Sequence, residues 1–272
     1  MREFDFVVVG SGIAGLCFAL KAARHGSVAI LTKRAAEESN TAWAQGGVAC
    51  VMAAEDSFDQ HVADTLDAGA GLCREDVVRA IVSEGPERMR ELMDWGVHFD
   101  MNGKGPALGR EGGHTQRRIL HHGDTTGREI AERLLERARE TLSITFFEDH
   151  FAIDLLTTGK LGYATEDRCL GLYVLDEKSG EVLTFRSDRV ILATGGCGRV
   201  YQFTTNPSVA TGDGVAMAWR AGATIANMEF VQFHPTCLYH PTLKNFLITE
   251  AMRARAACSS ARTGSRSCRS TT

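Results

Sequence analysis

The sequence predicts an α/β fold built on a parallel sheet, and three observations near the N-terminus indicate it. The apolar run at 6–9 has the length of a strand, the glycine-rich string GSGIAG follows at 10–15, and a helix-like stretch starts at Leu16. A second apolar run at 28–31 supplies the next strand. A strand, a tight turn and a helix in this order form a Rossmann-like unit whose backbone N–H groups and helix dipole face the phosphates of a dinucleotide.

Each glycine of the turn has its own expected role. Gly10 allows the turn, Gly12 lets the backbone approach the phosphates, and Gly15 lets the helix pack closely on the strand. An acidic residue that holds the adenosine ribose is expected about 20 residues further on. The chain has Lys33 there, between Thr32 and Arg34. A basic residue also suits the extra phosphate of NADP, so the turn alone leaves NADP, NAD and FAD open.

Two later segments favour a flavin. Residues 40–47 (NTAWAQGG) form a polar, glycine-rich loop that can lie against a flat ring and its phosphates. Taken alone, such a loop is more typical of an ordinary surface loop. The β-rich run 190–196 ends in Thr-Gly-Gly, and Asp213 then stands at the head of an apolar helix. A strand that returns to the nucleotide, followed by an acidic group at a helix start, fits a large two-part flavin site.

The middle of the chain predicts further helices and an antiparallel β layer. Residues 76–95 have helical apolar spacing, and we expect Pro86 to break them into two helices. Residues 126–142 read as another helix. Strands are expected at 144–148, 169–174 and 181–186, the last two flanking a turn at Ser179 and Gly180.

Composition narrows the class of protein. With 272 residues and 44% hydrophobic residues the chain can build a large core, and its net charge of −4 argues against general nucleic-acid binding. We expect no membrane association, because no apolar segment approaches the ~20 residues of a span, and the first strand follows the first residues without room for a signal peptide. Eight cysteines without a C-x-x-C pair indicate thiols in a reducing cytoplasm. No His/Cys set has metal-ligand spacing, so no metal is expected.

Five motifs in one order carry a resemblance to a known family. They are GSGIAGL at the N-terminus, SNTAWAQGG at 39–47, EGGHTQRRILHHGDTTGREI at 111–130, ATGGCGRVYQFTTNPSVATGDGVAMAWRAGA at 193–223 and MEFVQFHPT at 228–236. Together they resemble L-aspartate oxidase, which belongs with the flavoprotein subunits of succinate dehydrogenase and fumarate reductase. The resemblance runs from residue 4 to about Arg253. It implies a Rossmann-like FAD-binding domain, with a parallel sheet plus an antiparallel β layer, over 1–228, and the start of an α+β capping domain over 229–253.

Two positions separate the relatives. The succinate and fumarate enzymes usually carry a His, bonded covalently to the flavin, where this chain has Asn40. Asn cannot form that bond, so the resemblance implies noncovalent FAD. The pattern EGGH-x-x-RRI resembles aspartate oxidases, and a carboxylate at Glu111 suits a substrate that carries an ammonium group, which succinate lacks. Taken alone, Glu111 is equally typical of a solvated loop acid.

The resemblance also implies site residues. The residues expected to contact FAD are Gly10, Ser11, Gly12, Ile13, Ala14, Gly15, Lys33, Asn40, Thr41, Ala42, Trp43, Ala44, Gln45, Gly46, Gly47, Phe151, Ala152 and Asp213. The residues expected around the dicarboxylate substrate are Glu111, Gln232, His234 and Thr249. Outside the motif, a histidine such as His234 is more often structural than a ligand, and His121, His122 and His240 keep that structural interpretation.

The implied activity is the oxidation of L-aspartate to iminoaspartate, with electrons passed to O2 or fumarate. In the family this is the first step of de novo NAD biosynthesis, and a quinolinate synthase consumes the unstable imine. The alternatives are a soluble fumarate reductase or succinate dehydrogenase flavoprotein, a non-catalytic FAD-binding fragment and, from Lys33 and Arg34, an NADP-dependent dehydrogenase.

Residues 254–272 depart from the family pattern. They are rich in Arg and Ser and contain no acidic residue, so we expect a disordered tail of the kind that an out-of-frame reading produces. The arginine that acts as general acid in the family lies beyond this point, and no catalytic residue is assigned. The sequence therefore predicts that this chain is at best a weak FAD-binding fragment of an aspartate oxidase.

Overall fold

The structure is a computed structural model that describes residues 1–103, 105–163, 166–234, 237–238 and 246–248. The chain divides into two compact units that alternate along the sequence. Unit 1 comprises Met1–Ala44, Trp95–Val97 and Gly127–His234, and unit 2 comprises Gln45–Asp94, His98–Thr126 and Pro235–Thr272. Each unit is described by itself.

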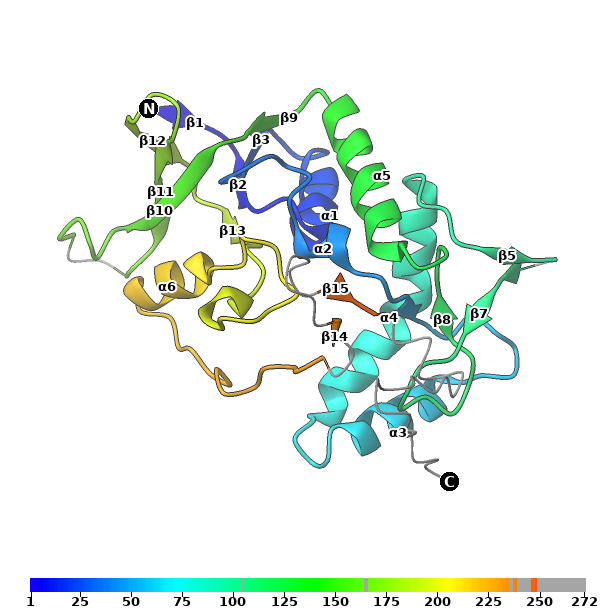
Figure 1. Cartoon of the computed structure of the whole chain (residues 1–272). Coiled ribbons are helices and arrows are strands. Elements are labelled where there is room, and N and C mark those ends of the chain that lie inside the picture. The colour runs from blue at the N-terminus through cyan, green and yellow to red at the C-terminus, as the bar shows by residue number, and fades with distance from the viewer. Residues whose placement is uncertain (104, 164–165, 235–236, 239–245, 249–272) are drawn as a thin grey trace. The chain divides into compact units, whose positions relative to one another are not determined.

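A parallel sheet forms the centre of unit 1 (Figure 1). Its strands are β2 (Phe6–Val9), β3 (Val28–Leu31), β9 (Ile144–Phe147) and β13 (Val190–Leu192). Their order is β13-β2-β3-β9, and all three neighbouring pairs are parallel. The predicted α/β class and the predicted strands at 6–9, 28–31 and 144–148 are therefore confirmed, and the β-rich run predicted at 190–196 contains β13 at its start. Parallel neighbours need crossover connections, which the chain supplies between these strands.

A second, largely antiparallel sheet packs against the first. Its strands are β1 (Arg2–Glu3), β10 (His150–Thr157), β11 (Cys169–Asp176) and β12 (Val182–Arg186), in the order β1-β12-β11-β10. The predicted ribbon around Ser179 and Gly180 is confirmed as β11 and β12, which pair from Gly171↔Arg186 to Leu175↔Val182. The sequence did not predict β10 as a strand, although β10 forms the longest pairing of this sheet, with β11.

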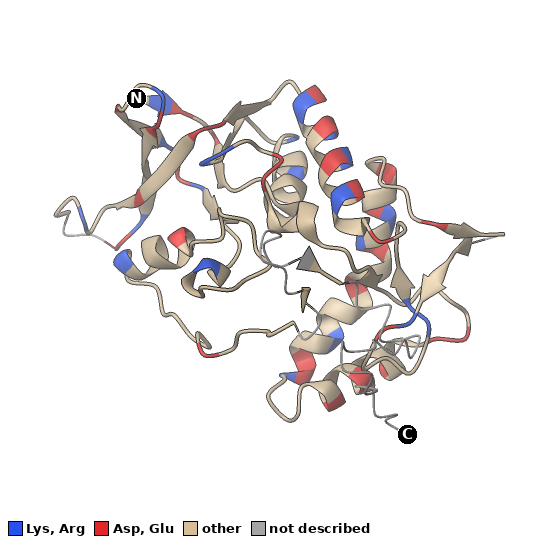
Figure 2. Ribbon diagram, in the orientation of Figure 1, with Lys and Arg blue, Asp and Glu red and all other residues tan. Residues whose placement is uncertain are grey.

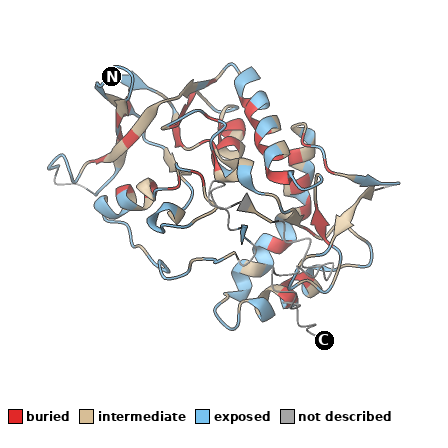
Figure 3. Cartoon of the chain, viewed as in Figure 1, coloured by how far each residue is buried: buried red, intermediate tan, exposed pale blue. Residues whose placement is uncertain are grey.

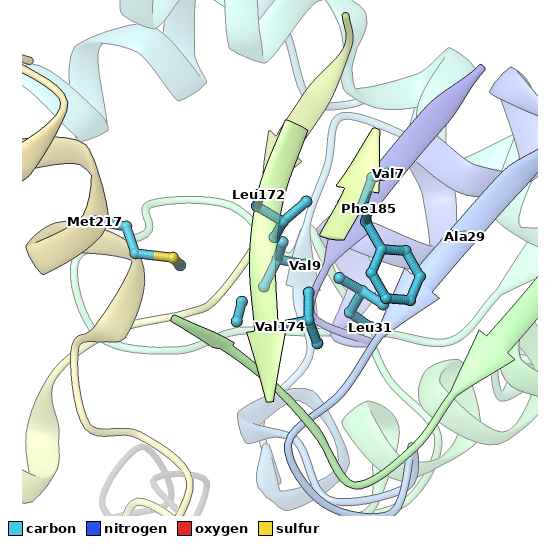
Figure 4. Close-up of a cluster of buried hydrophobic side chains, with 9 residues drawn as sticks. Val7, Val9, Ala29, Leu31, Leu172, Val174, Phe185 and Met217 are labelled. Carbon is cyan, nitrogen blue, oxygen red and sulfur yellow. The ribbon is translucent and has the colours of Figure 1, made fainter. Parts of the chain in front are cut away.

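The two sheets share one hydrophobic core. Val7, Val9, Ala29 and Leu31 alternate along β2 and β3 and so lie on one face of the parallel sheet, where they meet Leu172, Val174 and Phe185 of the antiparallel sheet (Figure 4). Val8 faces the other way, because a Cβ on Gly15 of the following helix would lie 3.2 Å from a methyl of Val8. Strands buried on both faces read as continuous apolar runs, which explains why 6–9 and 28–31 are so apolar.

Three α-helices longer than one turn belong to the described part of unit 1: α1 (Ile13–Ala22), α5 (Thr126–Glu140) and α6 (Asp213–Arg220). Short turns of helix, α2 (Asn40–Trp43) and η1 (Gly198–Val200), complete it. Helix α5 confirms the prediction at 126–142. Its apolar residues, such as Ile130, Leu134 and Ala138, are buried at helical spacing (Figure 3), and acidic and basic residues alternate over the rest of its surface (Figure 2).

The described part of unit 2 is built from two helices and short antiparallel ladders. The helices, α3 (Phe58–Ala68) and α4 (Glu75–Asp94), pack together. One ladder has the order β4-β8-β7, with β4 at Val48–Ala49, β8 at Ile119–Leu120 and β7 at Leu108–Gly109. Two further pairs are β5 (Met101–Asn102) with β6 (Gly105–Pro106), and β14 (Cys237–Leu238) with β15 (Phe246–Leu247). Across the described residues, no helix has the length and apolar character needed to cross a bilayer.

The expectation that Pro86 breaks the helix at 76–95 is wrong. Helix α4 runs without interruption from Glu75 to Asp94 and contains Pro86. Proline removes one backbone hydrogen bond from a helix interior. Here Pro86 is buried on the same side as Val82 and Met89, so the packing of this apolar face holds the helix together across the missing bond.

Candidate cofactor site

The turn before α1 has no room for side chains. Gly10 has a φ of +112°, and a Cβ at this position would lie 2.3 Å from the carbonyl oxygen of Ala193. A Cβ on Gly15 would lie 2.0 Å from the carbonyl oxygen of Gly10. The structure thus shows both the turn at Gly10 and the close helix packing at Gly15 that the motif predicts. The N-cap residue of α1 is Gly12, which has no side chain to cap the helix, so the start of α1 can present backbone N–H groups and its dipole to a bound group.

Helix α2 meets the start of α1. The Ile13 N–H donates a hydrogen bond to Thr41 Oγ1 at 3.0 Å, and a Cβ on Gly12 would lie 3.3 Å from the same oxygen. The sequence prediction of a loop over 40–47 is wrong for residues 40–43, which form α2. Ser39 is the signal that was overlooked, since its Oγ accepts a hydrogen bond from the Ala42 N–H at 3.2 Å and caps the helix.

A cavity of about 490 Å³ opens beside this turn, a volume typical of a ligand pocket. It lies at the carboxyl ends of β2, β3 and β13, where Val9, Leu31 and Leu192 line it, as is general for ligands of open α/β sheets. Other walls come from β10 and α6. The residues of the expected FAD set that line the cavity are Gly10, Ser11, Gly12, Ile13, Ala14, Lys33, Asn40, Thr41, Phe151, Ala152 and Asp213.

Not every expected residue lines this cavity. Gly15, Ala42, Trp43 and Ala44 belong to unit 1 but are not among its lining residues. The end of the second glycine loop, residues 45–47, belongs to unit 2. Gly15 contributes through packing, whereas a contact of the other six residues with FAD stays a prediction.

The positive charge of Lys33 is paired with a carboxylate in the cavity wall. Its Nζ donates hydrogen bonds to Asp213 Oδ2 and to Thr211 Oγ1, and it lies 5.9 Å from the centre of the Phe151 ring. The two charged side chains are only 22% and 25% exposed. A lysine already paired with a carboxylate offers little net positive charge to an additional phosphate. This pairing therefore argues against the NADP interpretation of Lys33 and Arg34.

The four expected substrate residues fall in different parts of the chain. Glu111 belongs to unit 2, where its carboxylate oxygen would lie 3.4 Å from a Cβ on Gly46. Gln232 is exposed and His234 half-buried at the end of unit 1. Thr249 lies outside the described residues, as do His240, Arg253 and the segment 254–272. The structure thus brings Glu111 close to the second glycine loop, and the grouping of the four residues stays a prediction.

Sequence reasoning missed a buried ionic cluster in unit 2, which we define as Arg118, Asp56 and Asp64. The Arg118 side chain is fully buried, and the side chains of Asp56 and Asp64 are 1% and 5% exposed. Burial alone would raise the pKa of Asp64, but hydrogen bonds from Thr115, Gln60 and Arg118 outweigh it and lower the pKa to about 2. The doubled arginine in EGGH-x-x-RRI was the available signal.

The neighbouring histidines fit a structural role. His121 Nδ1 lies 3.0 Å from Asp100 Oδ2. A hydrogen bond from the Gly123 N–H and the contact with His121 hold the pKa of Asp100 below its usual value. Among the residues that the structure describes, no group of three or more His, Cys, Asp or Glu side chains is arranged to hold a metal ion.

Comparison with known proteins places these features in a family. A family profile described as "FAD binding domain" matches residues 5–269. The chain is 54% identical over 254 residues to L-aspartate oxidase 1 of Ralstonia nicotianae, covering 92% of this chain and 48% of that protein. It is 50% identical over 258 residues to L-aspartate oxidase of Acinetobacter baylyi, covering 94% of this chain and 47% of that protein.

A solved structure gives the same picture. The quinol fumarate reductase flavoprotein of E. coli, determined as a point mutant, superposes with a TM-score of 0.86 at 34% identity, covering 93% of this chain and 43% of that one. The chain spans about half the length of the curated relatives it matches. The helix start at Gly12, the glycine turn and the cavity at the strand ends fit a dinucleotide cofactor. The chain belongs to the FAD-binding domain family, and FAD is its cofactor.

Proposed function

We propose that this chain is the FAD-binding part of an L-aspartate oxidase, and that it takes part in the oxidation of L-aspartate to iminoaspartate. The observation that carries the proposal is the place of Glu111 in unit 2, beside Gly46 of the second glycine loop. Identity of about 50% to two bacterial L-aspartate oxidases supports it. When bound, FAD supplies the oxidising power, because it accepts the two electrons that leave the substrate.

The residues of this chain supply binding and orientation. The carboxylate of Glu111 pairs with the ammonium group of L-aspartate, and Gln232, His234 and Thr249 donate hydrogen bonds to its carboxylates. In unit 1 the start of α1 holds the pyrophosphate, and Lys33 and Asp213 border the nucleotide pocket. Asn40 lines the same pocket and cannot bond covalently to a flavin, so we propose that FAD is held noncovalently.

The acceptor and the fate of the product extend the proposal. Electrons pass to O2 or fumarate, and the similarity to a fumarate reductase supports fumarate. Iminoaspartate is unstable in water, so an enzyme such as quinolinate synthase must consume it quickly. Free thiols are present at Cys50, Cys73, Cys169, Cys197 and Cys237, which supports work in a reducing compartment such as the cytoplasm.

Substrate binding tests the role of Glu111. The complete 272-residue protein, loaded with FAD, is titrated with L-aspartate and with succinate by calorimetry. Glu111→Gln is expected to weaken L-aspartate binding at least about tenfold, since it removes a charged hydrogen-bond acceptor, and to leave succinate binding within about twofold. The matched control is Glu55→Gln, which alters an exposed acid of the same unit and is expected to bind both ligands as the wild type does.

The alternatives predict different results. A succinate dehydrogenase or fumarate reductase flavoprotein binds succinate at least as tightly as L-aspartate. Its affinity for both ligands is unchanged by Glu111→Gln. A non-catalytic FAD-binding fragment takes up FAD but produces no heat with either dicarboxylate. Either result contradicts the aspartate oxidase assignment for this chain.

A further inference from the structure

The ionic cluster of unit 2 is more elaborate than a core needs. Arg118 Nε and Nη2 donate to the two carboxylate oxygens of Asp56, each at 2.8 Å, and Nη1 donates to Asp64 Oδ2 at 2.6 Å. Buried ion pairs of this kind add little net stability compared with apolar residues of similar size. Their fork geometry instead fixes direction, because a guanidinium and a carboxylate meet in one plane. The cluster is therefore suited to holding a backbone segment in one place.

The segment that it holds is 114–118. Thr115 donates to Asp64 both through its N–H, at 2.9 Å, and through Oγ1, at 2.9 Å and 3.0 Å to the two oxygens. His114 Nδ1 lies 3.3 Å from Arg118 Nη1, and this nitrogen must accept the hydrogen bond because arginine only donates. Gln60 Nε2 donates to Asp64 Oδ1 at 3.1 Å. The Asp64 carboxylate is thus the group through which helix α3 hydrogen-bonds to the segment 114–118.

The held segment leads directly to Glu111. Gly113 has a φ of +80°, and the chain turns back so that the His114 N–H donates to the Glu111 carbonyl at 3.4 Å. The Glu111 side chain then approaches Gly46, whose absent Cβ would lie 3.4 Å from Oε1. This distance is an ordinary van der Waals contact, so the Glu111 carboxylate lies directly beside the backbone of Gly46.

The other end of the segment returns to the same loop. After Arg118 the chain enters β8, and Leu120 pairs with Val48 of β4, directly after Gly47. The Cys50 N–H donates to the Arg118 carbonyl at 2.9 Å. Residues 46–50 and 111–120 therefore close a ring inside unit 2, tied at one side by the ladder β4-β8 and at the other by Glu111 beside Gly46.

We infer that Asp64 and Thr115 are positioning residues that hold Glu111 against Gly46, so that its carboxylate is fixed for the ammonium group of the substrate. The inference rests on the proposed function, in which Glu111 binds that group. When a substrate binds to a carboxylate on a mobile loop, part of the binding free energy is lost because the loop must become ordered. A carboxylate on a turn that is already anchored avoids this cost. The hydroxyl of Thr115 is the part of this anchor that can be removed with the least change of shape.

The experiment compares Thr115→Val, which removes the hydroxyl, with Thr115→Ser, which keeps it. Asp59→Asn is the matched control, because Asp59 lies on the same helix as Asp64 but its side chain is 85% exposed. On the complete FAD-loaded chain we measure backbone amide hydrogen exchange in residues 110–117 and, by calorimetry, the Kd values of L-aspartate and succinate.

Thr115→Val is expected to speed exchange in 111–115 about tenfold and to raise the L-aspartate Kd about tenfold, with the succinate Kd within about twofold. Thr115→Ser and Asp59→Asn are expected to match the wild type in both readouts. Restoration by Ser, together with a selective loss of the ammonium-bearing ligand, distinguishes positioning from a general loss of structure.

Unchanged exchange in Thr115→Val overturns the inference, because Glu111 would then be held without the hydroxyl. Equal losses for L-aspartate and succinate also overturn it, because they would show a damaged fold rather than a displaced carboxylate. Wild-type protein that binds L-aspartate no better than succinate overturns the proposed function instead. In that case the exchange measurement still decides whether Asp64 and Thr115 hold the Glu111 segment.

Discussion

The cofactor turn of unit 1 is built from backbone, whereas the ionic cluster of unit 2 is built from side chains. At Gly10 and Gly15 the absence of a Cβ is the essential property, since any side chain there would strike a carbonyl oxygen. In unit 2 a fully buried arginine shares its N–H groups between two carboxylates that come from other parts of the chain. The turn of unit 1 depends on the absence of side chains, whereas the cluster of unit 2 depends on a buried cation paired with two buried carboxylates.

This difference predicts how each region fails. A side chain added to the turn changes the local backbone shape but leaves no buried charge without a partner. A partner removed from the cluster leaves charge in a place without water, which costs several kcal/mol for each ion. The cluster should therefore be the more fragile of the two regions, although it has no cofactor to hold.

The largest effect is expected for Arg118→Leu. The change leaves Asp56 and Asp64 buried without their common cation, so the free energy of unfolding should fall by about 3–5 kcal/mol in chemical denaturation. The matched control is Arg79→Leu, which removes an arginine that pairs with Asp59 and Glu75 on an exposed surface and should change stability little. If the two variants unfold at the same denaturant concentration, the cluster does not have the role we give it.

A smaller loss of stability, together with weaker FAD binding, is expected for Gly10→Ala. The new Cβ would lie 2.3 Å from the Ala193 carbonyl at a φ of +112°, so the turn must move. We expect a loss of about 2–3 kcal/mol in stability and weaker binding of FAD in a fluorescence titration.

Gly105→Ala is the control for this change, because no described atom lies within 4 Å of the Cβ that it adds and Gly105 belongs to unit 2. It should bind FAD as the wild type does. Wild-type FAD affinity in Gly10→Ala would show that the turn tolerates a side chain, and the contrast between the two regions would then lose its basis.

The same contrast explains what could be predicted from the sequence. The turn is a local pattern of six residues, and its flanking strands and helix could be recognised from neighbouring residues alone. The strands of the parallel sheet were equally clear, because burial on both faces makes them apolar throughout. Strand β10 was missed because the polar residues His150 and Asp154 interrupt its apolar pattern. Its pairing with β11 is also irregular, with a shift of register between Ala152 and Asp154.

Unit 2 could not be predicted in this way. Arg118 lies 62 residues from Asp56 and 54 residues from Asp64, so the doubled arginine in EGGH-x-x-RRI does not by itself show which acidic residues lie beside it. Helix α3 was missed although Ser57 caps it and accepts from the Gln60 N–H. Pro86 was misinterpreted for a related reason. The rule that proline breaks a helix considers only the local backbone, whereas here the burial of Pro86 within unit 2 keeps α4 continuous.

The smallest expected effect is a response of the cluster to acid, and it depends on His61. This residue is 8% exposed, its ring lies 5.7 Å from that of His114, and within the described part of the chain its Nδ1 has no hydrogen-bond partner. Burial, then the charges of Arg118 and His114, lower the pKa of His61 from 6.5 and outweigh the opposite influence of Asp56 and Asp64.

The sign of the pH dependence follows from this shift. The unfolded chain binds a proton at His61 near pH 6.5 where the folded chain does not, so stability is complete above that pH and falls as the pH drops below it. Asp64 acts in the same direction at lower pH. Its pKa is about 2 when folded against 3.8 when free, so about 2 kcal/mol is lost as the pH falls through that interval.

His61→Phe separates the two contributions, because it keeps an aromatic ring beside His114 but cannot take up a proton. Below pH 6.5 its free energy of unfolding should vary less with pH than that of the wild type, while the loss below pH 4 from Asp64 should remain. His25→Phe, at an exposed position of unit 1, should keep the wild-type slope. If His61→Phe also keeps that slope, the imidazole is not held neutral by its surroundings, and the ionic cluster is more open to water than its burial indicates.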